Sequence, residues 1–149
     1  MTQIFENIPA DAEKSFSICD AQIDRITYGS NTVRFFFANG FQRVENNELI
    51  RTKNAYIELG NCAVDNFSCV VFKRTATEKG AELYGQPLSL EEIGIMLSDD
   101  ERKIEIYLEL YDFNCIYWRG VLLPYNPVGL SDRIDIEISG QVSITYYWE

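Results

Sequence analysis

The segment KIEIYLELY, from Lys103 to Tyr111, alternates apolar and polar side chains without a break. A period of two residues is typical of a strand with one face on the core and the other toward solvent. The segment therefore predicts a half-buried strand. Its apolar set would face the core and its polar set would face outward: Ile104, Ile106, Leu108 and Leu110 on the first face, and Lys103, Glu105, Tyr107, Glu109 and Tyr111 on the second.

The same alternation extends to both sides of this segment, with turn residues at short intervals. Aromatic and β-branched residues are frequent in these stretches, as expected of pleated, half-buried surfaces. Pro124 ends the strand that follows Asp112–Asn114 or confines it to an edge. Further strands are predicted over residues 16–28, 32–38, 41–44, 54–59, 62–73 (as a hairpin), 115–123, 133–138 and 142–148.

Two hairpins are predicted from their turn residues. Asn39-Gly40 accepts the positive φ angles of a type I′ turn and would return the chain directly through residues 41–44. The polar stretch 45–53 that follows is predicted to be a loop. A second hairpin centred on Asp65-Asn66 would place Cys62 opposite Cys69, close enough for a disulfide to form.

One helix is predicted, near residues 90–97. Ser89 and Glu92 have the spacing of a capping box, and Leu90, Ile93 and Leu97 then share one helical face. Together these patterns indicate a mainly β fold. We expect an antiparallel sandwich or open barrel of about eight or nine strands in a single domain spanning residues 1–149, with an α+β arrangement left open.

The overall charge excludes several classes of function. The 149 residues include 13 Lys and Arg, 23 Asp and Glu and no histidine, so the net charge is −10. Direct binding of nucleic acid or anionic membrane needs Lys and Arg, and is not expected. Without histidine, a Ser-His-Asp triad and the commonest metal ligand are both missing. The N-terminus has no signal-peptide pattern and no apolar run reaches the ~18 residues of a membrane span, which predicts a cytoplasmic protein.

The acidic residues are concentrated in one part of the chain. Residues 75–112 hold ten acids against three bases, a net charge of −7, whereas residues 1–74 have a net charge of −1. Such a field attracts a basic partner and raises its association rate, and tyrosines beside carboxylates suit an interface. Plain solvation of an acidic face is the alternative. The candidate partner-binding residues are Glu91, Glu92, Asp99, Asp100, Glu101, Glu105, Tyr107, Glu109 and Tyr111.

No sequence motif for catalysis, cofactor binding or metal binding is found. The four cysteines contain no C-x-x-C pair, and reduced, mostly buried thiols are the expected state. Asp135 and Glu137 lie two residues apart on one strand face, which leaves a carboxylate-dependent hydrolase as a remote alternative. In Arg34-Phe35-Phe36-Phe37, the aromatic residues next to a base are better explained as a strand with both faces covered than as a base-stacking platform.

Two early segments carry a resemblance to known proteins. Cys19-Asp20-Ala21-Gln22-Ile23-Asp24-Arg25-Ile26 and Val33-Arg34-Phe35-Phe36-Phe37-Ala38-Asn39-Gly40-Phe41 resemble the opening hairpin of many small acidic bacterial proteins. Some of those resemble immunity proteins of bacterial polymorphic-toxin systems. The resemblance covers about 25 residues of strand pattern and carries no catalytic motif. It implies a bacterial cytoplasmic binding protein.

The sequence thus favours a non-enzymatic protein that engages a basic protein partner through an acidic face, as an immunity or inhibitor protein would. A small-molecule-binding β-barrel or sandwich with an aromatic cavity is the main alternative. A carboxylate-dependent hydrolase and a structural subunit that forms homo-oligomers through its tyrosine-rich strand remain open. No cofactor and no metal are expected.

Overall fold

The computed structural model describes residues 3–7, 15–99, 101–124 and 132–149. Within these residues, thirteen strands form one ten-stranded and one three-stranded antiparallel sheet. The predicted mainly β fold with one short helix is confirmed, although the strands are more numerous than predicted. The elements are β1 (Gln3–Asn7), β2 (Phe16–Ser17), β3 (Gln22–Tyr28), β4 (Thr32–Phe37), β5 (Gln42–Glu45), β6 (Glu48–Arg51), β7 (Ala55–Gly60), the 3-10 turn η2 (Val64–Asn66), β8 (Phe67–Thr77), β9 (Gly80–Leu88), α1 (Leu90–Ser98), β10 (Lys103–Asp112), β11 (Cys115–Leu123), β12 (Arg133–Ser139) and β13 (Ser143–Trp148).

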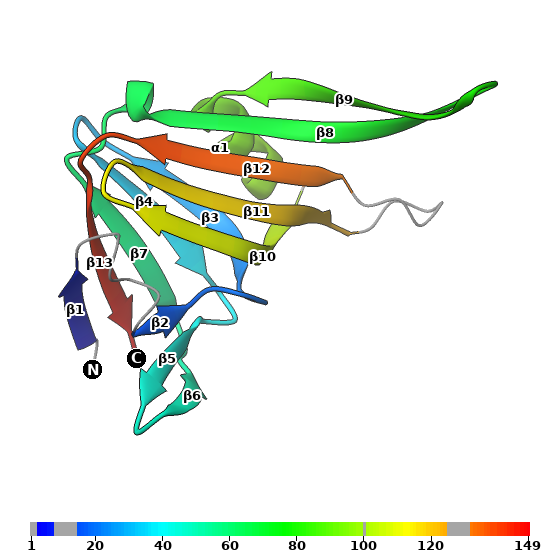
Figure 1. The fold of residues 1–149 in the computed structure, drawn as a ribbon. Coiled ribbons are helices and arrows are strands. Elements are labelled where there is room, and N and C mark those ends of the chain that lie inside the picture. Colours follow the sequence, from blue (N-terminus) through cyan, green and yellow to red (C-terminus); the bar gives the residue numbers. More distant parts are fainter. Residues whose placement is uncertain (1–2, 8–14, 100, 125–131) are drawn as a thin grey trace.

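The large sheet folds back on itself. Its strand order is β1-β13-β7-β4-β3-β10-β11-β12-β8-β9. In Figure 1, the half containing β7, β4 and β3 passes behind the half containing β10, β11 and β12. The two halves pack face to face, because the ring of Phe35 on β4 lies 4.9 Å from that of Trp118 on β11. The sheet is not closed into a barrel, and the arrangement agrees with the predicted sandwich or open barrel.

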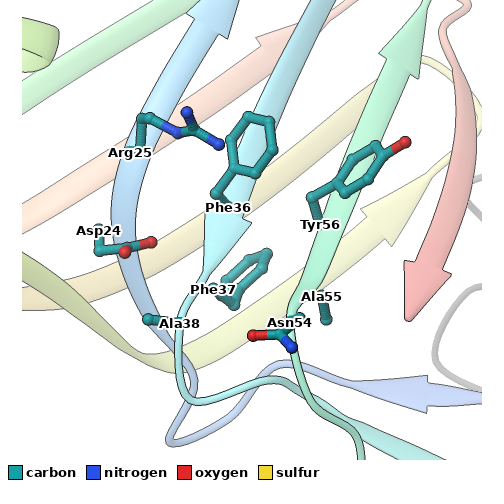
Figure 2. Close-up of a pocket in the computed structure, with 8 residues that line it drawn as sticks. All are labelled: Asp24, Arg25, Phe36, Phe37, Ala38, Asn54, Ala55 and Tyr56. Atoms are coloured by element: carbon teal, nitrogen blue, oxygen red, sulfur yellow. The ribbon is translucent and has the colours of Figure 1, made fainter. Parts of the chain in front are cut away.

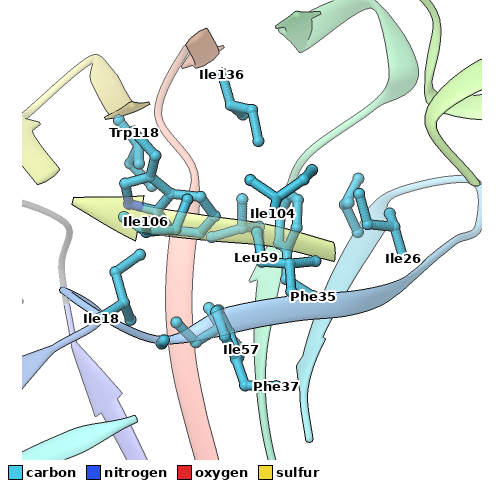
Figure 3. Packing of buried hydrophobic residues seen from close by; sticks show 14 of the residues in the cluster. Ile18, Ile26, Phe35, Phe37, Ile57, Leu59, Ile104, Ile106, Trp118 and Ile136 are labelled. Carbon is cyan, nitrogen blue, oxygen red and sulfur yellow. The ribbon is translucent and has the colours of Figure 1, made fainter. Parts of the chain in front are cut away.

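Apolar side chains fill the space between the two halves. Phe35, Trp118 and Ile136 are fully buried there, and Figure 3 shows this part of the core. Nearer the small sheet, Phe16 stacks on Tyr146 with 3.8 Å between ring centroids. Removing this apolar surface from water provides the main free energy that holds the halves together. On β12, the predicted inward set of Ile134, Ile136 and Ile138 is confirmed.

Helix α1 forms as its sequence predicts. The Ser89 hydroxyl accepts a hydrogen bond from the Glu92 amide, and the Glu92 carboxylate accepts one from the Ser89 amide, each at 3.1 Å. This capping box satisfies backbone donors that the first turn leaves free. Leu90, Ile93 and Leu97 are buried, and the helix contacts β3. In the part of the chain that the structure describes, no helix has the length and apolar character needed to cross a bilayer.

The hairpin predicted at Asn39-Gly40 is wrong. The Gly40 amide donates to the Phe37 carbonyl at 2.9 Å, and of the two turn residues Gly40 alone has a positive φ, of 73°. The chain leaves this turn toward β5, which pairs with β2 and β6 in the small sheet and not with β4. A Cβ atom at Gly40 would collide with the backbone of Thr52. The glycine therefore serves a close backbone approach rather than a two-residue hairpin.

The stretch 45–53 is a hairpin and not the predicted loop. Asn46 and Asn47 have φ angles of 52° and 63°, and they connect β5 to β6 as a two-residue turn. Asparagine tolerates the left-handed region better than other residues with a side chain. Every residue of β6 is exposed, so the strand shows no alternation of buried and exposed positions. The polar composition of this stretch therefore suggests a loop.

The hairpin predicted around Asp65-Asn66 is also wrong. The Ala63 amide donates to the Asn66 side chain at 2.8 Å, and this bond shapes the turn η2. Beyond it, Cys69 lies on β8 opposite Ile136 and Leu88, so Cys62 is not its cross-strand neighbour. Both thiols are buried and free.

Candidate functional site

Of the two carboxylates considered for catalysis, Glu137 is exposed and Asp135 is engaged in structural contacts. Asp135 accepts a hydrogen bond from the Tyr117 hydroxyl at 2.6 Å and forms ion pairs with Arg119 and Arg133, each at 3.2 Å. These contacts engage both carboxylate oxygens of Asp135 in the packing of the sheet, which makes it poorly suited to transfer a proton to or from a substrate. Among the described residues, no three Cys, Asp or Glu side chains converge in a way that could bind a metal ion.

The predicted partner-binding residues separate into two groups. The first group lies on helix α1 and the turn after it, and the second lies on β10. Asp100 falls outside the described residues. The helix group comprises Glu91, Glu92, Asp99 and Glu101, and the strand group comprises Glu105, Tyr107, Glu109 and Tyr111.

The helix group forms an exposed acidic face, called here the α1 face: Glu91, Glu92, Ile95 and Asp99. All four side chains are exposed, and that of Ile95 is 48% exposed. Residues four apart lie on the same side of a helix, so Ile95 sits between Glu91 and Asp99. The face thus combines an apolar side chain with flanking carboxylates. Glu101, after the helix, is also exposed and has a φ of 52°.

Helix stability explains only part of the α1 face. Glu91 and Glu92 lie in the first turn, where negative charge is favourable next to the helix dipole. Asp99 is the C-cap, where negative charge is unfavourable, and the last turn contains no basic residue. Exposure of Ile95 also contributes nothing to the core. Asp99 accepts a local hydrogen bond from the Ser98 hydroxyl at 3.2 Å, but helix stability accounts neither for its negative charge nor for the exposed Ile95.

The strand group does not form the predicted outward row. In β10, Ile106 pairs with Gly120 and Leu108 pairs with Arg119, so Tyr107 is an extra residue in a β-bulge. A bulge inverts the alternation that follows it. Leu110 is consequently 55% exposed, whereas Tyr111 packs against the core.

Before the bulge, Glu105 keeps its predicted outward side and is half-buried. Tyr107 at the bulge is exposed. After the bulge, the outward direction predicted for Glu109 and Tyr111 is wrong. The strand group therefore supplies one exposed tyrosine and one partly covered carboxylate to the surface.

Glu109 ties β10 to the segment before β3. Its carboxylate accepts hydrogen bonds from the Ser17 hydroxyl at 3.1 Å and from the Ile18 amide at 2.9 Å. It also accepts one from the Tyr111 hydroxyl at 2.7 Å, and that hydroxyl accepts one from the Trp118 indole at 3.2 Å. Charge-assisted bonds of this kind are the stronger ones in proteins. Glu109 is therefore a structural residue with little capacity left for a partner.

Burial strongly affects the ionisation of two tyrosines beside this network. Burial, and then the neighbouring Tyr146 and Glu109, raise the pKa of Tyr111 well above its ordinary value. Burial also raises the pKa of Tyr146, with Glu109 adding to the effect. The Tyr146 hydroxyl lies close to that of Tyr111, which partly offsets the rise, but it makes no hydrogen bond of regular geometry among the described residues. Both side chains therefore stay neutral at physiological pH.

The cysteines have the properties of structural thiols. Burial raises the pKa of all four, and that of Cys69 reaches about 12. The Cys19 thiol also lies 3.4 Å from the Glu109 carboxylate, which further disfavours a thiolate. A nucleophilic cysteine needs a lowered pKa. The four thiols are thus poorly suited to covalent catalysis.

A groove of about 370 Å³ opens on the outer face of β3, β4 and β7. Asp24 and Asn54 lie on opposite sides of it, and the rings of Phe36 and Tyr56 stand along its margin (Figure 2). One carboxylate oxygen of Asp24, Oδ1, is buried without a hydrogen-bond partner. Buried acceptors are normally satisfied, so this oxygen calls for a donor from outside the described residues. The groove is lined by Asp24, Arg25, Phe36, Phe37, Ala38, Asn54, Ala55 and Tyr56.

A second β-bulge creates the charged side of this groove. Ile23 pairs with Phe37 and Arg25 pairs with Phe36, so Asp24 is the extra residue. The bulge lets the consecutive residues Asp24 and Arg25 both line the groove, whereas in a regular strand they would point to opposite faces. The Arg25 guanidinium lies 3.9 Å from the centroid of the Phe36 ring and is thus held against that ring.

Aromatic residues continue the margin of the groove across the sheet. Phe36 on β4 and Tyr56 on β7 are direct cross-strand partners with centroids 5.1 Å apart, and Tyr56 stacks on Tyr147 of β13 at 4.3 Å. Cross-strand aromatic pairs of this kind stabilise a sheet. All three rings are half-buried. The row therefore gives the outer face of these strands a rigid, partly apolar surface.

Sequence reasoning missed the groove and the exposed position of Ile95. Within the FFF run, alternation already places Phe36 opposite Phe35 and Phe37, which are both buried. Alternation thus indicates that Phe36 points outward, but it does not indicate which residues of β3 and β7 lie beside it. Ile95 lies off the apolar face of Leu90, Ile93 and Leu97, and helical spacing could have shown this. The bulge at Asp24 has no local sequence signal.

Comparison of the chain with protein-family models, curated proteins and solved structures finds no significant match in any of the three.

Proposed function

We propose that this chain is a non-catalytic binding protein that engages a basic protein partner through the α1 face. The observation that carries the proposal is the exposed Ile95 set among Glu91, Glu92 and Asp99, on a helix without a base in its last turn. The predicted binding region is thereby reduced from the acidic segment 75–112 to its helix, because the Glu109 carboxylate is hydrogen-bonded inside the fold.

This composition matches the anatomy of a protein interface. An apolar side chain that becomes fully buried supplies most of the affinity, while polar neighbours at the rim supply specificity. Carboxylates around such an anchor repel acidic proteins and attract Lys and Arg. With a net charge of −10 behind the face, association with a basic protein is steered over about one Debye length, ~10 Å at 0.1 M salt.

An immunity or inhibitor protein acting in the cytoplasm is the specific form of this proposal. Its support is the acidic composition and the early strand pattern described above. Such a protein acts by covering a basic surface, which requires binding but no catalytic group. The alternative of a ligand cavity inside the sheet is less favoured, because Phe35 and Trp118 are in contact at its centre. Self-association through β10 has weaker support, since Tyr111 packs against the core.

The test is affinity capture at low and at high salt with two triple variants. The α1-face variant carries Glu91→Gln, Ile95→Ala and Asp99→Asn, and leaves Glu92 in place so that the capping box persists. The matched control carries Glu48→Gln, Leu49→Ala and Asp65→Asn, which remove the same charge and one exposed apolar side chain elsewhere. Captured proteins are identified by mass spectrometry.

The proposal predicts a basic protein that the wild-type and control proteins retain at low salt, and that the α1-face variant loses. Raising the salt concentration should release it. Capture of the same proteins by all three forms would contradict the proposal. So would a helix-dependent partner that is acidic.

A further inference from the structure

We infer that the groove beside Asp24 binds the guanidinium group of an arginine side chain presented by the basic partner. The inference rests on the proposed function for the source of the arginine. It does not rest on that function for the chemistry of the groove, which follows from the residues that line it.

The first argument is the unpaired acceptor. Asp24 Oδ1 is buried without a hydrogen-bond partner among the described residues, and the Asp24 side chain lines a groove that is open to solvent. Its nearest cation in sequence, Arg25, is held over the Phe36 ring at 3.9 Å. An acceptor in this state gains most from a donor that carries a positive charge.

The second argument is the shape and composition of the groove. Ala38 and Ala55 are small, and the edges of the Phe36 and Tyr56 rings stand along one margin (Figure 2), their faces being covered by Arg25, by each other and by Tyr147. A guanidinium is planar and weakly hydrated, so it tolerates contact with apolar ring edges while it donates two hydrogen bonds to one carboxylate. An ammonium is compact and strongly hydrated, and it fits such a margin less well.

The third argument concerns charge on the far side of the groove. The Asn54 amide donates to the Glu149 carboxylate at 2.7 Å, so a second carboxylate stands near the end opposite Asp24. With Arg25 included, Asp24 and Glu149 leave a net charge of −1 at the groove, which favours a cation over an anion. The volume of about 370 Å³ accommodates an arginine side chain with part of its flanking backbone.

The experiment titrates the ¹⁵N-labelled full chain with N-acetyl-arginine-N-methylamide and follows backbone amide shifts by NMR. Capped lysine, capped citrulline and free arginine are the comparison probes. Citrulline has the shape of arginine without its charge. The variants are Asp24→Asn, Arg25→Met and the control Asp65→Asn, whose exposed carboxylate lies on η2.

Capped arginine should shift the amides of residues 23–25, 36–38 and 54–56 saturably. Asp24→Asn should weaken this binding at least tenfold, whereas Arg25→Met should tighten it by removing a like charge. Capped lysine and capped citrulline should each bind at least tenfold more weakly, and Asp65→Asn should have no effect. Thermal unfolding of each variant verifies that the fold is retained.

Several results would overturn the inference. They are the absence of saturable shifts at these residues, equal binding of capped arginine by Asp24→Asn, loss of binding in Arg25→Met instead, and equal binding of lysine or citrulline. If free arginine bound tenfold more tightly than the capped form, the groove would be a site for a small molecule. That result would contradict the inference that the arginine belongs to a protein partner.

The two proposals fail separately. If the α1-face variant loses the partner while Asp24→Asn binds both partner and probe normally, the groove inference fails and the proposed function stands. If the probe binds as predicted but the α1-face variant retains the partner, the proposed function fails and the chemistry of the groove stands.

Discussion

At the scale of single residues, Glu109 joins parts of the fold that are far apart in sequence. It lies on β10 and accepts hydrogen bonds from Ser17 and Ile18, 92 and 91 positions earlier in the chain. Through Tyr111 the network reaches Trp118, which packs on Phe35 in the opposite half of the sheet. A carboxylate with this many donors holds the entry to β3 in place, and its removal would leave several of these donors without a partner.

The residue-scale prediction is that Glu109→Ala lowers the free energy of unfolding by about 1–3 kcal/mol, because partly buried donors lose a charged acceptor. Glu48→Ala, which removes an exposed carboxylate from β6, should change it by no more than about 0.5 kcal/mol. Urea unfolding followed by circular dichroism measures both. Equal effects of the two substitutions would show that the network around Glu109 contributes no stability.

A second residue-scale prediction concerns alkaline pH. The pKa values of Tyr111 and Tyr146 are raised in the folded chain, so the unfolded chain loses these protons first as pH rises past about 10. The folded state then binds more protons, and the free energy of unfolding falls by about 1.4 kcal/mol per pH unit for each tyrosine.

Urea unfolding at several pH values from about 9 to 11 measures this slope. Tyr146→Phe removes a hydroxyl without a hydrogen-bond partner among the described residues, so it should cost little near neutral pH and make the alkaline slope shallower by one tyrosine. An unchanged slope would mean that Tyr146 ionises in the folded protein as it does in the unfolded one.

At the scale of elements, helix α1 combines a strong cap with a weak interior. Ser89 and Glu92 cap it reciprocally, whereas Gly94 lies in its middle with open space where a Cβ would stand. Glycine in a helix interior costs backbone entropy relative to alanine. The glycine has no packing role, and it leaves the helix backbone open beside Ile95.

The element-scale prediction is that Gly94→Ala raises the free energy of unfolding by about 0.5–1 kcal/mol. Ser89→Ala should lower it by about 1 kcal/mol through loss of the cap. Urea unfolding tests both, and the opposite signs serve as an internal control. A destabilising Gly94→Ala would mean that the space above this residue is occupied.

Local sequence patterns were sufficient to predict the elements that are determined by interactions between residues close in sequence. The capping box gave α1, and alternation gave β11, β12 and β13 close to their observed bounds. Long-range contacts decided the rest. The bulge at Tyr107 turns Glu109 and Tyr111 to the opposite face of the strand. No residue in KIEIYLELY indicates that a bulge occurs there. The groove likewise joins residues of three strands around a bulge at Asp24, and strand order cannot be obtained from alternation.

At the scale of the whole molecule, the acidic charge is divided by the fold into structural and exposed parts. Glu109 and Asp135 hold strands together, while Glu91 and Asp99 flank Ile95 on the α1 face. The net charge of −10 supplies a long-range field, and the α1 face supplies the short-range contact. Charge should therefore set the rate of association, and Ile95 should set the lifetime of the complex.

The most direct test is the association rate constant of the captured basic partner, measured at ionic strengths from about 0.02 to 0.2 M. For the wild-type chain and the Glu48→Gln, Leu49→Ala, Asp65→Asn control, the rate should fall steeply as salt rises. The Glu91→Gln, Ile95→Ala, Asp99→Asn variant should associate several-fold more slowly at low salt, with a flatter salt dependence and a faster dissociation. Identical rates and salt dependence for the variant and the wild-type chain would contradict the role assigned to the α1 face.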